Sequence, residues 1–150
     1  CPPHSDQVFA ALAGLLSGNP AILPDKSVCD TCPTIRKGKG QLEKLRRFLQ
    51  APKFSADEPL DKMHCLLEQG VLCMGPVTKA GCGGDGVSPR CISARVPCRG
   101  CYGPVKPDSN QMLDMLNALA SNGIAIESLP ETASLLRFSG AHGRLCPPRK

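Results

Sequence analysis

The spacing of apolar positions along the chain predicts helices near both ends and an irregular middle. Apolar side chains recur three or four residues apart in four segments, which is the period of a helix with one buried face. The predicted helices are Ser5–Ser17, Gln41–Gln50, Asp108–Ser121 and Pro130–Phe138. In the first, Val8, Leu12 and Leu15 share a face, in the second Leu42, Leu45 and Leu49 are predicted to point inward, and in the third Met112, Leu116 and Leu119 share a face.

Residues that commonly start or end helices flank two of these segments. Ser5 is the predicted N-cap of the first helix, and Asp108 or Ser109 that of the third, because their side-chain oxygens can accept the free N–H groups of a first turn. The pair at 122–123, Asn-Gly, is a typical stop after the third helix.

The stretch from Cys65 to Pro104 has no regular period. It is rich in glycine and proline, and it contains six of the ten cysteines. A loop of this length is unusual in a compact domain unless bonds other than a hydrogen-bond ladder hold it. Cysteine–metal bonds could do so, and the predicted fold class is therefore mostly α with long irregular loops.

Composition supports a fold that needs such bonds. The 150 residues suit a single domain. The chain has no tryptophan, one tyrosine and four phenylalanines, so large core side chains are scarce. A chain of this kind gains stability from disulfides or bound metals.

Eight of the cysteines form a pattern suited to metal binding. Cys29 with Cys32, and Cys98 with Cys101, are two Cys-x-x-Cys pairs, whose sulfurs can reach one metal centre. The four remaining candidates are Cys65, Cys73, Cys82 and Cys91. Eight thiolates complete two four-ligand centres, which could be 4Fe–4S clusters or zinc ions. Disulfides are a third possibility, and spacing alone leaves all three open.

Other residues suggest little further chemistry. No Ser-His-Asp set, phosphate loop or paired-carboxylate site is present, so no catalytic residue is predicted. His64 precedes a candidate ligand, and we interpret it as a solvated side chain or, alternatively, as a hydrogen-bond donor to a cluster sulfur. Cys146 matches no metal-binding pattern and is predicted to be an idle thiol.

Targeting signals are absent from the sequence. No apolar run approaches the roughly 20 residues that cross a membrane, and no signal peptide is recognisable. Reduced cysteines serving metal or redox chemistry are then expected, which predicts a cytoplasmic protein. Because the first residue is Cys1 and not methionine, we expect the chain to be processed or incomplete at its start.

Two segments carry a specific resemblance to a known family. The run from Cys65 to Cys82 contains a Cys-x-Gly-Pro-x-Thr motif and ends in a cysteine, and residues 97–101 read Pro-Cys-Arg-Gly-Cys. Together they resemble the cluster-binding C-terminal part of NiFe-hydrogenase small subunits, a family that includes the 20 kDa subunit of NADH-quinone oxidoreductase. Cys1-Pro2-Pro3 resembles the family's Cys-Pro-Pro motif, whose cysteine is the last ligand of the proximal cluster.

Within that family, this sequence is similar to the small subunits of cytoplasmic hydrogenases of the methyl-viologen-reducing type, which do not reduce the deazaflavin coenzyme. The resemblance implies an electron-transfer subunit that relays electrons between a NiFe site in a separate large subunit and an acceptor subunit. That acceptor would be an iron–sulfur or flavin protein linked to heterodisulfide reductase, and the deazaflavin coenzyme and a nicotinamide enzyme are the alternatives. The alternative function is a zinc-stapled structural or interaction domain.

The resemblance also implies a ligand set, two 4Fe–4S clusters in this chain and a third, proximal cluster in a complete subunit. The family pattern gives the distal cluster Cys29, Cys32, Cys65 and Cys73. It gives the medial cluster Cys82, Cys91, Cys98 and Cys101. In membrane-bound and periplasmic relatives a histidine stands in place of Cys29, and a proline commonly replaces Cys91 and leaves a three-iron cluster. Cys1 would serve the proximal cluster only together with the family's N-terminal domain.

The chain is expected to depart from the family in two ways. The flavodoxin-like N-terminal domain of the family is absent from this sequence, and residues 83–90 form a longer loop than in close relatives. We divide the chain into 1–28 (end of the proximal-cluster region and linking helix), 29–107 (two-cluster domain) and 108–150 (C-terminal helices and tail). The formal charge is +5, but two four-thiolate clusters would each contribute roughly −2, so no nucleic-acid partner is predicted.

Overall fold

A computed structural model describes residues 4–19, 24–38, 45–46, 49, 51–83, 88–125 and 127. Its elements, in chain order, are α1 (Ser5–Leu16), η1 (Val28–Thr31), η2 (Gly75–Val77), α2 (Arg90–Ser93) and α3 (Gln111–Ser121). The two η elements are single 3-10 turns. Within these ranges the backbone forms isolated bridges and no strands, so the fold consists of few helices and long irregular loops.

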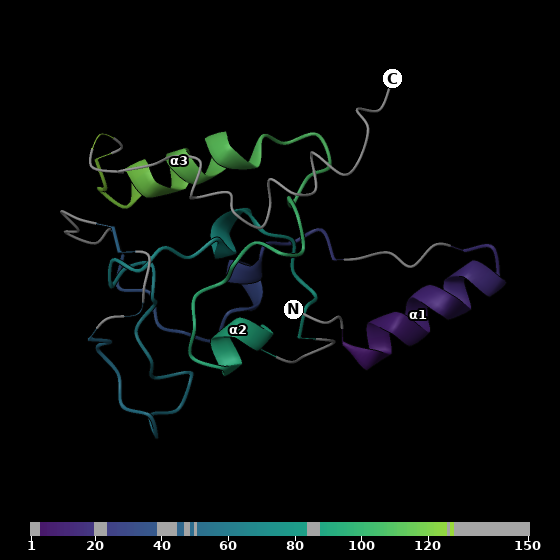
Figure 1. Ribbon diagram of the computed structural model, residues 1–150, viewed down its shortest axis with the longest axis horizontal. Coiled ribbons are helices and arrows are strands. Elements are labelled where there is room, and N and C mark those ends of the chain that lie inside the picture. Colours follow the sequence, from purple (N-terminus) through teal and green to yellow (C-terminus); the bar gives the residue numbers. More distant parts are fainter. Residues whose placement is uncertain are drawn as a thin grey trace.

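Helix α1 lies at one end of the molecule, apart from the other helices (Figure 1). It begins after His4, whose ring Nδ1 accepts the Asp6 N–H at 3.4 Å. The predicted cap at Ser5 is therefore wrong by one residue, and the helix ends at Leu16. None of its residues is buried, and Phe9 and Leu16 are 71% and 91% exposed.

Helix α3 packs on η2 and supplies part of the core. Its cap is Asn110, whose side-chain oxygen accepts the N–H groups of Met112 and Leu113 at 3.1 and 3.2 Å. Neither Asp108 nor Ser109, the predicted caps, does this. Met115 and Leu119 are fully buried. The predicted stop is confirmed, because the helix ends at Ser121 and is followed by its C-cap Asn122 and by Gly123.

The predicted helix over Gln41–Gln50 is wrong at Arg46. Arg46 N–H donates to Gly70 O at 2.6 Å and Arg46 O accepts Leu72 N–H at 2.7 Å, which is a parallel bridge and not a helical turn. Leu45 and Leu49 do point inward, as predicted, and pack against buried residues. The rest of that segment and the whole of Pro130–Phe138 lie outside the described residues.

Four isolated bridges connect distant parts of the irregular chain. They pair Ser27 with Lys79, Ile35 with His64, Arg46 with Val71, and Thr78 with Pro104. The segment carrying Cys29 and Cys32 is thereby fastened to the segment carrying Cys65 and Cys73. The bridge at Thr78 fastens that segment in turn to the region just after Cys101.

The buried residues form two small groups around these bridges. The larger comprises Val28, Leu67, Cys73, Met74, Val77, Cys98, Met115, Leu119 and Ile124. The smaller comprises Met63, Leu66, Val71 and Ile92. Two cysteines lie inside the larger group, so the core is built around thiols. Across the described parts of the chain, no helix has the length and apolar character that spanning a membrane requires.

Candidate metal centres

Four cysteines from two distant segments line one small cavity. They are Cys29, Cys32, Cys65 and Cys73. Cys29 and Cys32 lie at η1, which the 27–79 bridge holds against η2. Cys65 follows the 35–64 bridge directly, because its N–H donates to Ile35 O at 2.9 Å. The long-range bridges therefore place the four thiols around a common space.

Backbone geometry adapts this cavity to sulfur. A methyl group at Gly75 would lie 3.1 Å from the Cys29 sulfur and 3.5 Å from the Cys73 sulfur, so a side chain at this position would require the Cys29 sulfur to shift. The Cys98 N–H donates to the Cys73 sulfur at 3.3 Å. N–H donors directed at sulfur favour the thiolate, which is the form that binds metals.

Burial keeps the Cys29 and Cys73 thiols protonated when no metal is bound. It raises the pKa of Cys29 to about 12, more than the nearby Arg36 guanidinium lowers it. Burial likewise raises the pKa of Cys73 to about 12, although N–H groups of Gly75 and Cys98 oppose the shift. A metal bound here would have to displace the protons, since a coordinating thiol is deprotonated.

The other four cysteines form a second group beside the first. Burial raises the pKa of the Cys91 thiol, the Arg99 N–H lowers it, and the Cys101 and Cys82 thiols are close enough to raise it further. Burial also raises the pKa of Cys98, which interacts with both Cys73 and Cys91. Cys98 therefore lies at the boundary between the two groups.

The Cys98–Cys101 turn depends on one glycine. Gly100 has a φ of +80°, in the left-handed region that side chains with a Cβ rarely adopt. This conformation lets the Gly100 N–H donate to the Cys98 sulfur. The Cys-x-Gly-Cys pair thus presents a sulfur and an N–H donor from a single tight turn.

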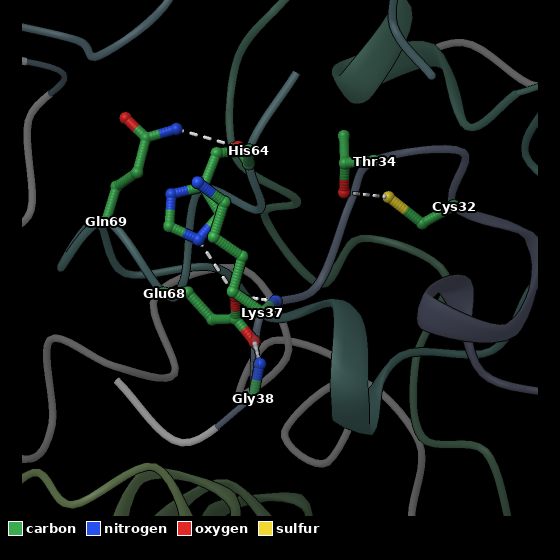
Figure 2. Close-up of polar contacts among 7 residues, drawn as sticks. All are labelled: Cys32, Thr34, Lys37, Gly38, His64, Glu68 and Gln69. Atoms are coloured by element: carbon green, nitrogen blue, oxygen red, sulfur yellow. Dashed lines mark hydrogen bonds and ion pairs between the residues drawn. The ribbon is translucent and has the colours of Figure 1, made fainter. Parts of the chain in front are cut away.

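A polar network supports the cavity from outside (Figure 2). Glu68 accepts the N–H groups of Lys37 and Gly38 at 2.7 and 3.1 Å and pairs with His64 Nε2 at 2.9 Å. The Gln69 side chain donates to His64 O at 2.7 Å. His64, predicted to be solvated or to donate to sulfur, is half-buried and bonded to Glu68. The network closes the loop that follows the first Cys-x-x-Cys pair.

We expect Glu68→Gln to loosen that loop. Burial raises the pKa of the Glu68 carboxyl, but hydrogen bonds from Lys37, His64 and Gly38 lower it more. The carboxylate therefore stabilises the fold above its unfolded pKa of about 4.3, and this is lost as pH falls through the lower folded value. At pH 7 the variant should lose about 1–3 kcal/mol locally.

Amide hydrogen exchange measures this change. The Lys37 and Gly38 amides should exchange about tenfold to a hundredfold faster in Glu68→Gln, as that local loss implies. Asp57→Asn, at an exposed carboxylate, should leave both rates unchanged. Unchanged rates in the Glu68 variant would contradict the role given to the network.

Three contacts at or near the cysteines were not predicted from the sequence. Thr34 and Thr78 each place a hydroxyl at a cysteine sulfur, and Glu68 binds the loop after Cys32. The spacing of His64 and Glu68, four residues apart, was a signal for their pair. The threonine of the Cys-x-Gly-Pro-x-Thr motif was a signal for Thr78. Cys1 and Cys146 lie outside the described residues.

The donor set fits a group that binds through thiolate sulfur. The eight cysteines are free thiols, and backbone N–H groups point at several of their sulfurs. Within the described ranges, no three or more His, Cys, Asp or Glu side chains are grouped so that they could hold a single metal ion. The structure therefore places the cysteine thiols in two neighbouring sets within a small cysteine-rich domain.

Comparison with known proteins gives hydrogenase subunits as relatives, while no protein-family model matches the chain. It is 37% identical over 123 residues to an F420-non-reducing hydrogenase subunit of Methanothermobacter thermautotrophicus, which covers 81% of this chain and 36% of that protein. It is 36% identical over 140 residues to a vhu-type F420-non-reducing hydrogenase subunit of Methanocaldococcus jannaschii, covering 93% of this chain and 44% of that protein.

A third relative carries the cofactor class in its name. The F420-non-reducing hydrogenase iron-sulfur subunit of Archaeoglobus profundus is 36% identical over 126 residues, covering 81% of this chain and 37% of that protein. The chain thus spans about two fifths of the length of these relatives. They are homologues over most of this chain, and they are hydrogenase subunits.

Proposed function

We propose that this chain is an electron-transfer part of a NiFe-hydrogenase small subunit and holds two 4Fe–4S clusters. The observation that carries the proposal is the cavity lined by Cys29, Cys32, Cys65 and Cys73. The four thiols are the number a 4Fe–4S cluster requires. The name of one relative, an iron-sulfur subunit, supports the same chemistry.

The distal cluster would take those four thiols, and the medial cluster would take Cys82, Cys91, Cys98 and Cys101. A bound cluster supplies reversible one-electron storage. The chain's part is to hold each sulfur, exclude water from Cys73 and Cys98, and direct N–H groups at the thiolates. These features determine the reduction potential of an iron–sulfur centre.

The contact between the two groups supports a relay. The Cys98 N–H donates to the Cys73 sulfur, and the Met74 N–H donates to Cys98 O at 2.9 Å. A ligand of one cluster would thus touch a ligand of the other, which gives an electron a short route between them. Cys1 would add a ligand to a proximal cluster in a complete subunit.

The proposed partners rest on the family resemblance, and the relatives' names support only that other hydrogenase subunits are present. Those proteins are subunits of hydrogenases that do not reduce F420. We therefore propose a cytoplasmic complex in which hydrogen reacts at a NiFe site in a separate large subunit. Electrons would leave to an iron–sulfur or flavin subunit linked to heterodisulfide reductase.

Metal analysis tests this function. Anaerobically purified full chain should contain about eight irons and eight acid-labile sulfides, the content of two 4Fe–4S clusters. Its oxidised spectrum should bleach on reduction with dithionite. Stoichiometric zinc without labile sulfide would overturn the proposal and favour a zinc-stapled domain, and about four irons would overturn the two-cluster assignment.

A further inference from the structure

Two buried threonines lie against cysteines of the two different groups. The Thr34 hydroxyl oxygen is 3.1 Å from the Cys32 sulfur, and the Thr34 residue is 7% exposed (Figure 2). Thr78 is 1% exposed, its hydroxyl donates to Met74 O at 2.5 Å, and the hydroxyl lies close enough to Cys98 to lower the pKa of that thiol. We infer that Thr34 is a positioning residue that raises the reduction potential of the cluster held by Cys32, an inference that rests on the proposed function.

The backbone on both sides of Thr34 is held in place by hydrogen bonds. On one side, Cys32 N–H donates to Cys29 O at 3.4 Å. On the other, Ile35 N–H donates to Met63 O at 2.9 Å, and Ile35 O accepts Cys65 N–H at 2.9 Å. Because the backbone is pinned and the side chain buried, water cannot easily replace the hydroxyl at this sulfur.

The direction of the hydrogen bond follows from ligation. In a free thiol either atom can donate, but a metal-bound thiolate has no hydrogen and can only accept. The Thr34 hydroxyl must then be the donor to Cys32. A hydrogen bond to an ionised acceptor is stronger than one between neutral groups. The reduced cluster carries one more negative charge than the oxidised cluster, so the bond favours reduction and raises the potential.

Thr78 is the corresponding threonine beside the second set of cysteines, where it lies near Cys98. Burial and the nearby Cys73 thiol raise the pKa of Cys98, whereas hydrogen bonds from Gly100 N–H and the Thr78 hydroxyl lower it. The Thr78 hydroxyl also lies 2.5 Å from Met74 O, which has a second donor, Val77 N–H, at 3.2 Å. The hydroxyl can therefore turn to the Cys98 sulfur without leaving that carbonyl unpaired.

The experiment compares four variants of the full chain by redox titration followed by electron spin resonance. Thr34→Val should shift one cluster to a more negative potential, and Thr34→Ser, which keeps the hydroxyl, should restore the wild-type value. Thr78→Val should shift the other cluster alone. Thr31→Val is the control, because its hydroxyl donates to Val28 O at 3.2 Å and not to sulfur, and neither potential should change.

Each contrary result has a distinct meaning. Wild-type protein without iron and sulfide overturns the proposed function and this inference with it. With both clusters present in the wild type, an unshifted potential in Thr34→Val overturns the inference alone. So does an equal shift in Thr34→Ser, which would reflect packing, or loss of iron from Thr34→Val. A shift of the same cluster by Thr34→Val and Thr78→Val also overturns it.

Discussion

Replacing Cys65 with serine should remove one cluster and unfold much of the surrounding loop. Burial raises the pKa of the Cys65 thiol, while N–H groups of Glu68 and Leu67 lower it, so the turn at 65–68 directs backbone N–H groups at this sulfur. Its backbone N–H also forms part of the 35–64 bridge. Serine keeps this N–H, so the variant removes the thiol from the cavity while the bridge beside it can still form.

The expected size of this effect is large because metal binding and folding are coupled. In small metal-stapled domains the bound metal contributes on the order of 10 kcal/mol, against about 1 kcal/mol for an ordinary substitution. Iron in Cys65→Ser should fall from about eight to about four per chain. Iron and sulfide assays with anaerobic thermal unfolding measure both consequences.

The two cysteines outside the proposed ligand sets, Cys1 and Cys146, provide the control variants. Cys146→Ser and Cys1→Ser replace thiols that belong to neither proposed set, so both variants should keep about eight irons, the content of two 4Fe–4S clusters. Loss of a cluster in Cys146→Ser would show that the proposed ligand set is wrong. A Cys65→Ser protein that keeps both clusters would lead to the same conclusion.

Sequence periodicity predicted α1 and α3 but placed their first residues imperfectly. Asn110 caps α3, and the sequence offered Asp108 and Ser109 as equally suitable candidates nearby. The three residue types have similar capping strength, so local preference cannot choose among them. The choice depends on which side chain the fold leaves facing the first turn. At α1 the cap is His4, which is not a typical capping residue.

Long-range backbone contacts explain the error near Arg46. Leucines at helical spacing predicted a helix there, yet Arg46 donates and accepts across a bridge to 70–72. Its guanidinium also donates to Gln69 O at 3.0 Å. Tertiary hydrogen bonds override a weak local preference. The inward leucines were still predicted correctly, because a segment anchored on the core buries its apolar residues in either conformation.

The cysteine pattern was more informative than the helical pattern. Two Cys-x-x-Cys pairs indicated a metal-binding chain, and the first of these pairs lines a cavity together with Cys65 and Cys73. Spacing alone did not sort the eight cysteines into groups, because the sorting depends on the bridges at 27–79 and 35–64. The Thr34 and Glu68 contacts arise from the same bridges, and so they too required the structure.

Replacing Cys91 with proline should convert the second cluster into a three-iron centre. Cys91 is the second residue of α2, where a helix leaves its N–H groups free, so the missing N–H of proline costs little. Proline also disfavours a helical conformation at Arg90, so Cys91→Ala serves as a companion variant with unrestrained backbone. Both changes remove the thiol and would leave Cys82, Cys98 and Cys101 as the remaining members of the proposed ligand set.

The measurement is electron spin resonance on oxidised and reduced protein. Loss of one iron and one thiolate alters cluster type and charge, the main determinants of reduction potential. We therefore expect a new three-iron signal in the oxidised state, about seven irons per chain, a more positive potential for this cluster and an unchanged first cluster. If the proline and alanine variants both keep two complete 4Fe–4S clusters, Cys91 is not a ligand. The fourth thiolate would then come from Cys1 or Cys146.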